Sequence, residues 1–158
     1  MSFSQTCKTV DELSIGERFE KEFRVEEKDV ELFGKISGDF NPIHFDEDYA
    51  RKSMFGKRIA HGLISLSKFS GIFGTNMPGA GTLWSSQTVQ FLKPVYIGVQ
   101  YKAIAEVVDL DRRRATIATW VEDAAGEKVL LGEAVVIPPT ARAKEKLLRN
   151  ASPVDGSL

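Results

Sequence analysis

Three polar residues of the stretch SGDFNPIHFD, which begins at Ser37, have the types and spacing needed to move a proton. Asp39 and His44 lie on either side of Pro42, and the kinked backbone expected around that proline can turn both side chains toward one point. A carboxylate and an imidazole that share a water molecule form a general base and a general acid. Asn41 adds an amide that could hold a reacting partner without titrating. The stretch therefore predicts an acid–base site.

The same residues also have an ordinary structural interpretation. Aspartate and asparagine beside an Asn-Pro step often cap helices or bind their own backbone, as Asp46 is expected to do for the helical turn that follows it. Taken singly, Asp39 and His44 could each serve only the loop. Their occurrence together, in a chain with only two histidines, shifts the balance toward chemistry and leaves both interpretations open.

A glycine opens the most apolar helix that the sequence predicts. Gly62 would expose backbone N–H groups at the positive end of the helix dipole, where an oxygen that gains negative charge is best stabilised. The alternative is that Gly62 only permits close packing, and His61 before it is interpreted as structural. Ser70, two helical turns further on and on about the same face, could hydrogen-bond the acid–base pair or merely its own backbone.

Other kinds of site fit the sequence less well. His44 and His61 lack the close spacing of zinc ligands, so no metal site is expected. No Gly-x-Ser-x-Gly motif surrounds a serine, and the short GAG at 79–81 does not indicate a nucleotide-binding loop. Cys7 is the only cysteine, which excludes an internal disulfide and favours a reducing, cytoplasmic location. Proton transfer without a cofactor is the chemistry that remains.

Length and charge limit the possible partners. A chain of 158 residues, 42% hydrophobic and 27% charged, fits one globular domain with a substantial core. A net charge of −1 gives no electrostatic basis for binding nucleic acid or an anionic membrane. No apolar run approaches the roughly 18 residues of a membrane span. The basic run Arg112–Arg114 is interpreted as a solvated hairpin end, with a contact to a phosphorylated ligand as the alternative.

Periodicity predicts the elements that must position these residues. Residues 12–25 contain an edge strand, 26–39 form a short amphipathic helix, and Gly62–Phe73 form a helix that is apolar and buried on nearly every side. Strands follow a breaker at 78–81, and the last three should form an antiparallel meander: 82–92, 99–109, 113–122 and 128–137. The result is an α+β fold in which a curved sheet wraps a long central helix. Its open edge is expected to pair with a second copy in a homodimer.

Several segments together resemble the MaoC-like (R)-specific enoyl-CoA hydratases, also called hydratase 2. The specific part is the run from Ser37 to His44 followed by Ala50, and shorter segments also match: Ile59–Gly62, Pro78–Gly79, Gln90–Val95 and Gly132–Ala134. The resemblance spans residues 15–138 and implies a hot-dog fold, with active sites near the interface of a homodimer. Residues 1–14 are then an N-terminal extension, expected to be mobile, and residues 139–158 a polar tail, expected to fray.

The resemblance also implies a reaction and a role for each site residue. The family adds water reversibly to trans-2-enoyl-CoA, giving (R)-3-hydroxyacyl-CoA. Asp39 would activate the water, and His44 would orient it and supply the proton for C2, although one group could serve both steps. Asn41 assists, the Gly62 amide holds the thioester oxygen, and Ser70 steadies the pair.

Alternatives to this reaction remain open at the level of sequence. The chain could be a non-catalytic module that binds acyl-CoA or an acyl carrier protein, or a related hot-dog dehydratase that acts on a branched or hydroxylated acyl-CoA. Phe69, Phe73 and Trp84 could shape an acyl channel, although aromatic residues beside a central helix more often belong to the core. The sequence predicts neither the acyl chain length, nor the physiological direction, nor the choice between CoA and carrier-protein thioesters.

Overall fold

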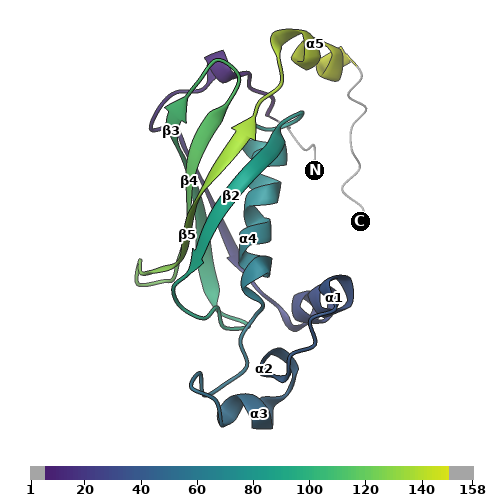
Figure 1. Cartoon of the computed structure of the whole chain (residues 1–158), viewed down its shortest axis with the longest axis vertical. Coiled ribbons are helices and arrows are strands. Elements are labelled where there is room, and N and C mark those ends of the chain that lie inside the picture. Colours follow the sequence, from purple (N-terminus) through teal and green to yellow (C-terminus); the bar gives the residue numbers. More distant parts are fainter. Residues whose placement is uncertain (1–5, 150–158) are drawn as a thin grey trace.

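The computed structural model describes residues 6–149, which form a curved antiparallel sheet against a central helix (Figure 1). A 3₁₀ turn at Val10–Glu12 leads into strand β1, Arg18–Arg24. The central helix α4, Gly62–Gly71, continues as a π-helical turn over Ile72–Asn76. The other helices are α1, Glu27–Ser37; α2, Pro42–Phe45; α3, Glu47–Arg51; and α5, Ala141–Arg149. The other strands are β2, Leu83–Phe91; β3, Gln100–Leu110; β4, Ala115–Glu122; and β5, Lys128–Ile137.

The sheet has the strand order β1-β3-β4-β5-β2, and every neighbouring pair is antiparallel. The predicted edge strand, the meander β3-β4-β5 and the α+β class are confirmed. Register shifts interrupt the pairing between Trp84 and Ser86 in β2 and between Val107 and Asp109 in β3. Such bulges bend a strand and increase its twist, which helps the sheet curve around α4. Among the helices of residues 6–149, none has the length and apolar character that a bilayer span requires.

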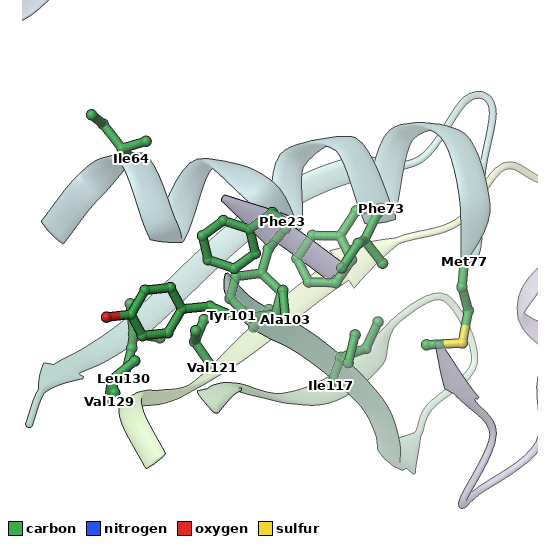
Figure 2. Packing of buried hydrophobic residues seen from close by; sticks show 14 of the residues in the cluster. Phe23, Ile64, Phe73, Met77, Tyr101, Ala103, Ile117, Val121, Val129 and Leu130 are labelled. Atoms are coloured by element: carbon green, nitrogen blue, oxygen red, sulfur yellow. The ribbon is translucent and has the colours of Figure 1, made fainter. Parts of the chain in front are cut away.

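The core lies between α4 and the inner face of the sheet (Figure 2). Phe69 and Phe73 of this helical segment are almost completely buried, so they belong to the core rather than to a channel. Trp84 meets the Phe73 ring edge-on, with centroids 5.2 Å apart. Ala103 and Ala105 on β3 have fully buried side chains, and their small size leaves room for the bulky helix residues. Burying each large side chain contributes about 1.5–3 kcal/mol.

One face of the central helix is open in the single chain. Leu63 is 51% exposed, and the exposed residues recur at helical spacing: Leu63, Ser67, Ser70 and Gly74, here called the α4 stripe. The prediction that this helix is buried on nearly every side is therefore wrong for one chain taken alone. Its small and apolar residues predicted a covered surface without indicating what covers it.

Both ends of the described chain are more ordered than the sequence predicts. Cys7 is buried and forms a β-bridge with Gly79, and the Cys7 Sγ donates to the Ala80 carbonyl. The prediction that residues 1–14 are mobile is therefore wrong for the part around Cys7. Fraying is likewise wrong for residues 141–149, which form α5 (Figure 1). Lys144 of α5 contacts both carboxylate oxygens of Glu12, at 2.5 and 2.7 Å. Residues 1–5 and 150–158 lie outside the described chain.

Gly132 on β5 is a position where the sheet tolerates no side chain. A Cβ there would lie 1.9 Å from the Thr88 carbonyl oxygen of β2, so the two strands would have to separate. We expect Gly132→Ala to lower the free energy of unfolding by about 1–3 kcal/mol, measured by urea denaturation at a fixed protein concentration. Gly71→Ala is the matched control, because a Cβ at Gly71 meets only the flexible end of Lys21, at the ordinary contact distance of 3.7 Å. Equal stability of the two variants would contradict this prediction.

Candidate active site

The polar stretch begins where α1 ends. Gly38 caps α1 with a left-handed backbone, φ 76°, and its N–H donates to the Gly34 carbonyl at 2.9 Å. Glycine suits this position because other side chains disfavour that conformation. The Asp39 N–H then donates to Ser37 Oγ, and Asp39 Oδ1 accepts the N–H of Asn41, each at 3.1 Å. These local bonds orient Asp39 before any distant part of the chain is involved.

The residues predicted to form a loop after Asp39 instead contain the short helix α2. Asn41 is its N-cap, since Oδ1 accepts the Ile43 N–H at 3.2 Å, and Pro42 occupies the first turn, where no N–H is needed. Asp46 caps the following helix α3, as predicted. The Asn-Pro step therefore starts a helical turn, and this turn carries His44 into the interior.

His44 is 8% exposed, and a hydrogen bond fixes its ring. Nδ1 lies 2.8 Å from the Ile59 carbonyl oxygen, which can only accept, so Nδ1 carries the proton of this bond. Burial lowers the pKa of His44 from its ordinary value; the bond to Ile59 opposes this shift, and the neighbouring His61 reinforces it. In the neutral ring Nε2 is an acceptor. His44 is therefore placed to act as a base.

The Asp39 carboxylate faces this acceptor across a short gap. Asp39 Oδ2 lies 3.9 Å from Nε2 of His44 and 3.9 Å from Nε2 of His61, and the Asp39 side chain is 50% exposed. That separation is too long for a direct hydrogen bond, but it fits one water bonded at about 2.8 Å to both the carboxylate and His44. The structure thus brings the predicted pair together with room for a shared water.

His61, which the sequence suggested to be structural, lies inside the site. Its ring stacks on that of His44 with centroids 3.8 Å apart, and its Nε2 is 3.0 Å from the Asp39 carbonyl oxygen. Ser65, one helical turn further along α4, is fully buried and borders the same cavity. The sequence offered one signal for this role of His61, the small number of histidines. The chain has only two, and the structure brings both to the same place.

A cavity of about 360 Å³ adjoins these residues at the N-terminal end of α4. Gly62 is the first residue of α4, so its N–H has no acceptor within the helix. A Cβ at Gly62 would come within 2.7 Å of the Phe91 ring, which supports the packing interpretation of this glycine and leaves its amide beside the cavity. The rest of the wall is largely apolar and includes Phe33, Phe55, Leu63, Phe91, Val95 and Leu130.

Three groups of residues with predicted functional roles do not border this cavity in the single chain of residues 6–149. Asn41 uses its Oδ1 to cap α2, and Ser70 lies exposed in the α4 stripe. Arg112–Arg114 follow the far end of β3, roughly 23 Å along the strand from Ala103 at about 3.3 Å per residue. Ala103 marks the cavity end of β3: it pairs with Val121 of β4, which pairs with Leu130 of β5 at the cavity wall. Functional roles for these residues stay predictions.

By distance alone, Asp39, His44 and His61 could hold a metal ion, since one ligand atom of each lies within 4.8 Å of the others. The hydrogen bonds of the two rings oppose this. Nδ1 of His44 donates to the Ile59 carbonyl and Nε2 of His61 to the Asp39 carbonyl, so neither of these nitrogens offers a lone pair to a metal. Proton transfer fits the arrangement better than metal binding.

Comparisons with known proteins agree with this geometry. Residues 12–129 match the family described as MaoC like domain. A 3-hydroxybutyryl-CoA dehydratase from Methylorubrum extorquens is 40% identical over 139 residues, covering 86% of each chain. An (R)-specific enoyl-CoA hydratase from Aeromonas caviae is 35% identical over 129 residues, 80% of this chain and 96% of that one. The solved structure of the R-hydratase PhaJ1 from Pseudomonas aeruginosa has a TM-score of 0.80 and 38% identity, covering 86% of this chain and 89% of that one.

This chain therefore belongs to the MaoC-like family of hot-dog hydratases and dehydratases. The resemblance found in the sequence and the hot-dog fold that it implied are both confirmed. The family match begins before β1 and ends in β5, so it includes all of the residues that surround the cavity except Leu130.

The burial of His44 should be visible in its titration. Because burial favours the neutral ring, we expect the NMR titration midpoint of His44 to lie below the ordinary value of 6.5. The unfolded chain then takes up this proton first as the pH falls. The stability that His44 contributes is complete above 6.5 and is lost as the pH falls toward its folded-state pKa. His44→Asn identifies the resonance, and a midpoint at or above 6.5 would refute the prediction.

Proposed function

We propose that this chain adds water reversibly across the C2–C3 double bond of trans-2-enoyl-CoA, giving (R)-3-hydroxyacyl-CoA. The observation that carries the proposal is the position of Asp39 Oδ2, 3.9 Å from Nε2 of His44, at the wall of a largely apolar cavity. Relatives named as a hydratase and as a dehydratase support it, because these names describe opposite directions of one kind of reaction.

The reacting water would lie between the Asp39 carboxylate and the neutral His44 ring. Both groups accept hydrogen bonds, so they would hold the water by its two protons and leave an oxygen lone pair free to attack C3. As the O–C3 bond forms, the electrons of the double bond move toward the thioester oxygen and one water proton passes to the pair. C2 then takes a proton from the pair, which regains its starting state.

The tautomer of His44 refines the roles predicted from sequence. With the ring proton held on Nδ1 by the Ile59 carbonyl, neutral His44 has no proton on Nε2 to donate. The proton that reaches C2 is therefore one that the pair first takes from the water. Asp39 and His44 both remain able to make this transfer, and they act as one unit.

Negative charge that builds on the thioester oxygen needs a donor in the same cavity. The Gly62 N–H lies at the positive end of the α4 dipole and is free of helical hydrogen bonds. Apolar walls formed by residues such as Phe33 and Phe91 limit the water around this donor, which strengthens its interaction with a nascent oxyanion. Gly62 is therefore assigned to the thioester oxygen.

The working unit is proposed to be a homodimer. In the single chain, β2 is an unpaired edge of the sheet with Leu83 and Phe91 exposed, and the α4 stripe is open as well. Pairing two β2 edges would join the sheets and cover exposed strand groups. Ser70 belongs to the α4 stripe. Its predicted hydrogen bond to an acid–base pair could therefore form only across a dimer interface on this face.

Asp39 should be essential for hydration. We expect Asp39→Asn to slow the hydration of crotonyl-CoA by about 10²–10⁴-fold, followed as loss of the enoyl absorbance. Asparagine keeps the size of the side chain and an oxygen for the Asn41 N–H, so the fold should persist. Asp46→Asn is the matched control, since Asp46 caps α3 outside the cavity and asparagine caps equally well.

Retained activity in Asp39→Asn would overturn the assignment of this residue. A wild-type protein that hydrates no enoyl-CoA of short or medium chain length would overturn the proposed reaction and favour the acyl-CoA binding module. An equal loss of activity in Asp46→Asn would show that both substitutions lower activity by disturbing the fold.

The dimer can be tested on the α4 stripe. Ser67 lies in the middle of the stripe and is exposed, so a charge there should be harmless to a single chain. We expect Ser67→Glu to halve the mass measured by light scattering after size exclusion, because two unpaired charges would be buried where the two stripes meet. Arg113→Glu on the exposed β3–β4 turn should remain dimeric. A wild-type monomer, or an unchanged dimer in Ser67→Glu, would rule out this interface.

A further inference from the structure

The proposed mechanism leaves a buried histidine of the site without a role. His61 comes directly before Gly62 at the start of α4, is 3% exposed, and contacts both members of the acid–base pair. Its ring also packs against Phe33 and Phe45, with centroids 4.9 and 5.8 Å away. Enclosing a polar ring in this way is costly unless its nitrogen atoms form useful contacts.

One nitrogen of His61 has a partner and the other has none. Nε2 lies 3.0 Å from the Asp39 carbonyl oxygen, an acceptor, so Nε2 carries a proton. Nδ1 is buried and lacks a hydrogen-bond partner among residues 6–149. The hydrogen-bond geometry therefore assigns the donor role of His61 to Nε2.

This donor acts on the main chain of Asp39 rather than on its carboxylate. The Nε2 atom is 3.0 Å from the carbonyl oxygen but 3.9 Å from Oδ2. The other contacts that orient Asp39 come from Ser37 and Asn41, its close neighbours in the same loop. The bond from His61 differs, because it joins this loop to α4, whose first residue is Gly62. It therefore determines where the carboxylate stands relative to the Gly62 amide.

We propose that His61 is a positioning residue for the hydration reaction. Its Nε2–H holds the Asp39 loop in register with the start of α4, and its ring covers one face of His44, which favours the neutral form of that base. Because His61 and Gly62 are consecutive, one short backbone segment sets the spacing between the activated water and the thioester oxygen. The kinetic consequences rest on the proposed function, whereas the tautomer and the hydrogen bond do not.

Two substitutions separate the contributions of the donor and the ring. His61→Phe keeps an aromatic ring over His44 and removes the donor, whereas His61→Gln keeps an amide donor that can reach the Nε2 position. We expect kcat for crotonyl-CoA to fall about 10²-fold in His61→Phe, as for a misplacement of about 1 Å. In His61→Gln it should stay within about fivefold of wild type. KM should change less than kcat in both variants, because the His61 side chain directs its hydrogen bond to the Asp39 main chain rather than into the cavity.

A pH profile gives a readout that a purely structural role would not move. The titratable groups in contact with His61 are Asp39 from the loop after α1 and His44 from α2, while α1 contributes the apolar Phe33. His61→Gln removes the ring that covers His44 and should make protonation of His44 easier, so the acid limb of kcat should move to higher pH in this variant. His61→Phe keeps a ring over His44 and should leave the acid limb in place. Wild-type kcat in His61→Phe, or an unchanged acid limb in His61→Gln, would overturn the proposal.

Phe45→Leu is the matched control for packing. Phe45 meets the His61 ring edge-on but makes no hydrogen bond to the acid–base pair, so its substitution should lower thermal stability and leave kcat near the wild-type value. If Phe45→Leu and His61→Phe lowered kcat equally for an equal loss of stability, His61 would be merely structural. That result would refute the positioning role.

Nitrogen-15 NMR of the imidazole rings tests the proposal without an activity assay. We expect the Nε2–H tautomer for His61 and the Nδ1–H tautomer for His44 in the wild-type protein. A proton on Nδ1 of His61 would overturn the positioning role even in an active hydratase. An inactive wild-type protein would overturn the proposed function instead, and the tautomers would still decide whether His61 holds the Asp39 loop.

Discussion

The hydrogen bond between His44 and the Ile59 carbonyl is the interaction on which the arrangement of the site depends. It joins α2 to the segment that leads into α4, 15 residues further along the chain. It also commits the ring proton to Nδ1, so that Nε2 of the neutral ring faces Asp39 as an acceptor. A ring free to rotate could present either nitrogen. The bond therefore determines a chemical state as well as a position.

The fold gives this interaction a rigid support. Phe69, Ile72 and Phe73 fix the later part of the central helical segment against the sheet, while its first turn, with Gly62, borders the cavity. The small side chains of Ala103 and Ala105 let the helical segment lie close to the strands. A site held by well-packed elements keeps its geometry better than one held by loops alone. Here the loop that carries Asp39 is bonded to the start of such an element.

Sequence patterns predicted the periodic elements and the local half of the site. The meander and the central helix follow from which faces are buried, and Asp39 and His44 are close enough in sequence to be recognised as a pair. α2 was missed because side-chain caps, rather than periodicity, form it. The placement of His61 depends on a main-chain atom 22 residues away, and α5 depends on Glu12, 132 residues away. Contacts of this kind leave no local pattern in a sequence.

The candidate reacting groups and part of the cavity wall come from different parts of the chain. Asp39, His44 and Gly62 belong to one continuous segment that follows α1, whereas Phe91 and Leu130 belong to strands of the sheet. Changes in β2 and β5 can therefore reshape the cavity and leave the spacing of Asp39 and His44 intact. A scaffold divided in this way can diversify the shape of its cavity in evolution without rebuilding the polar residues beside it.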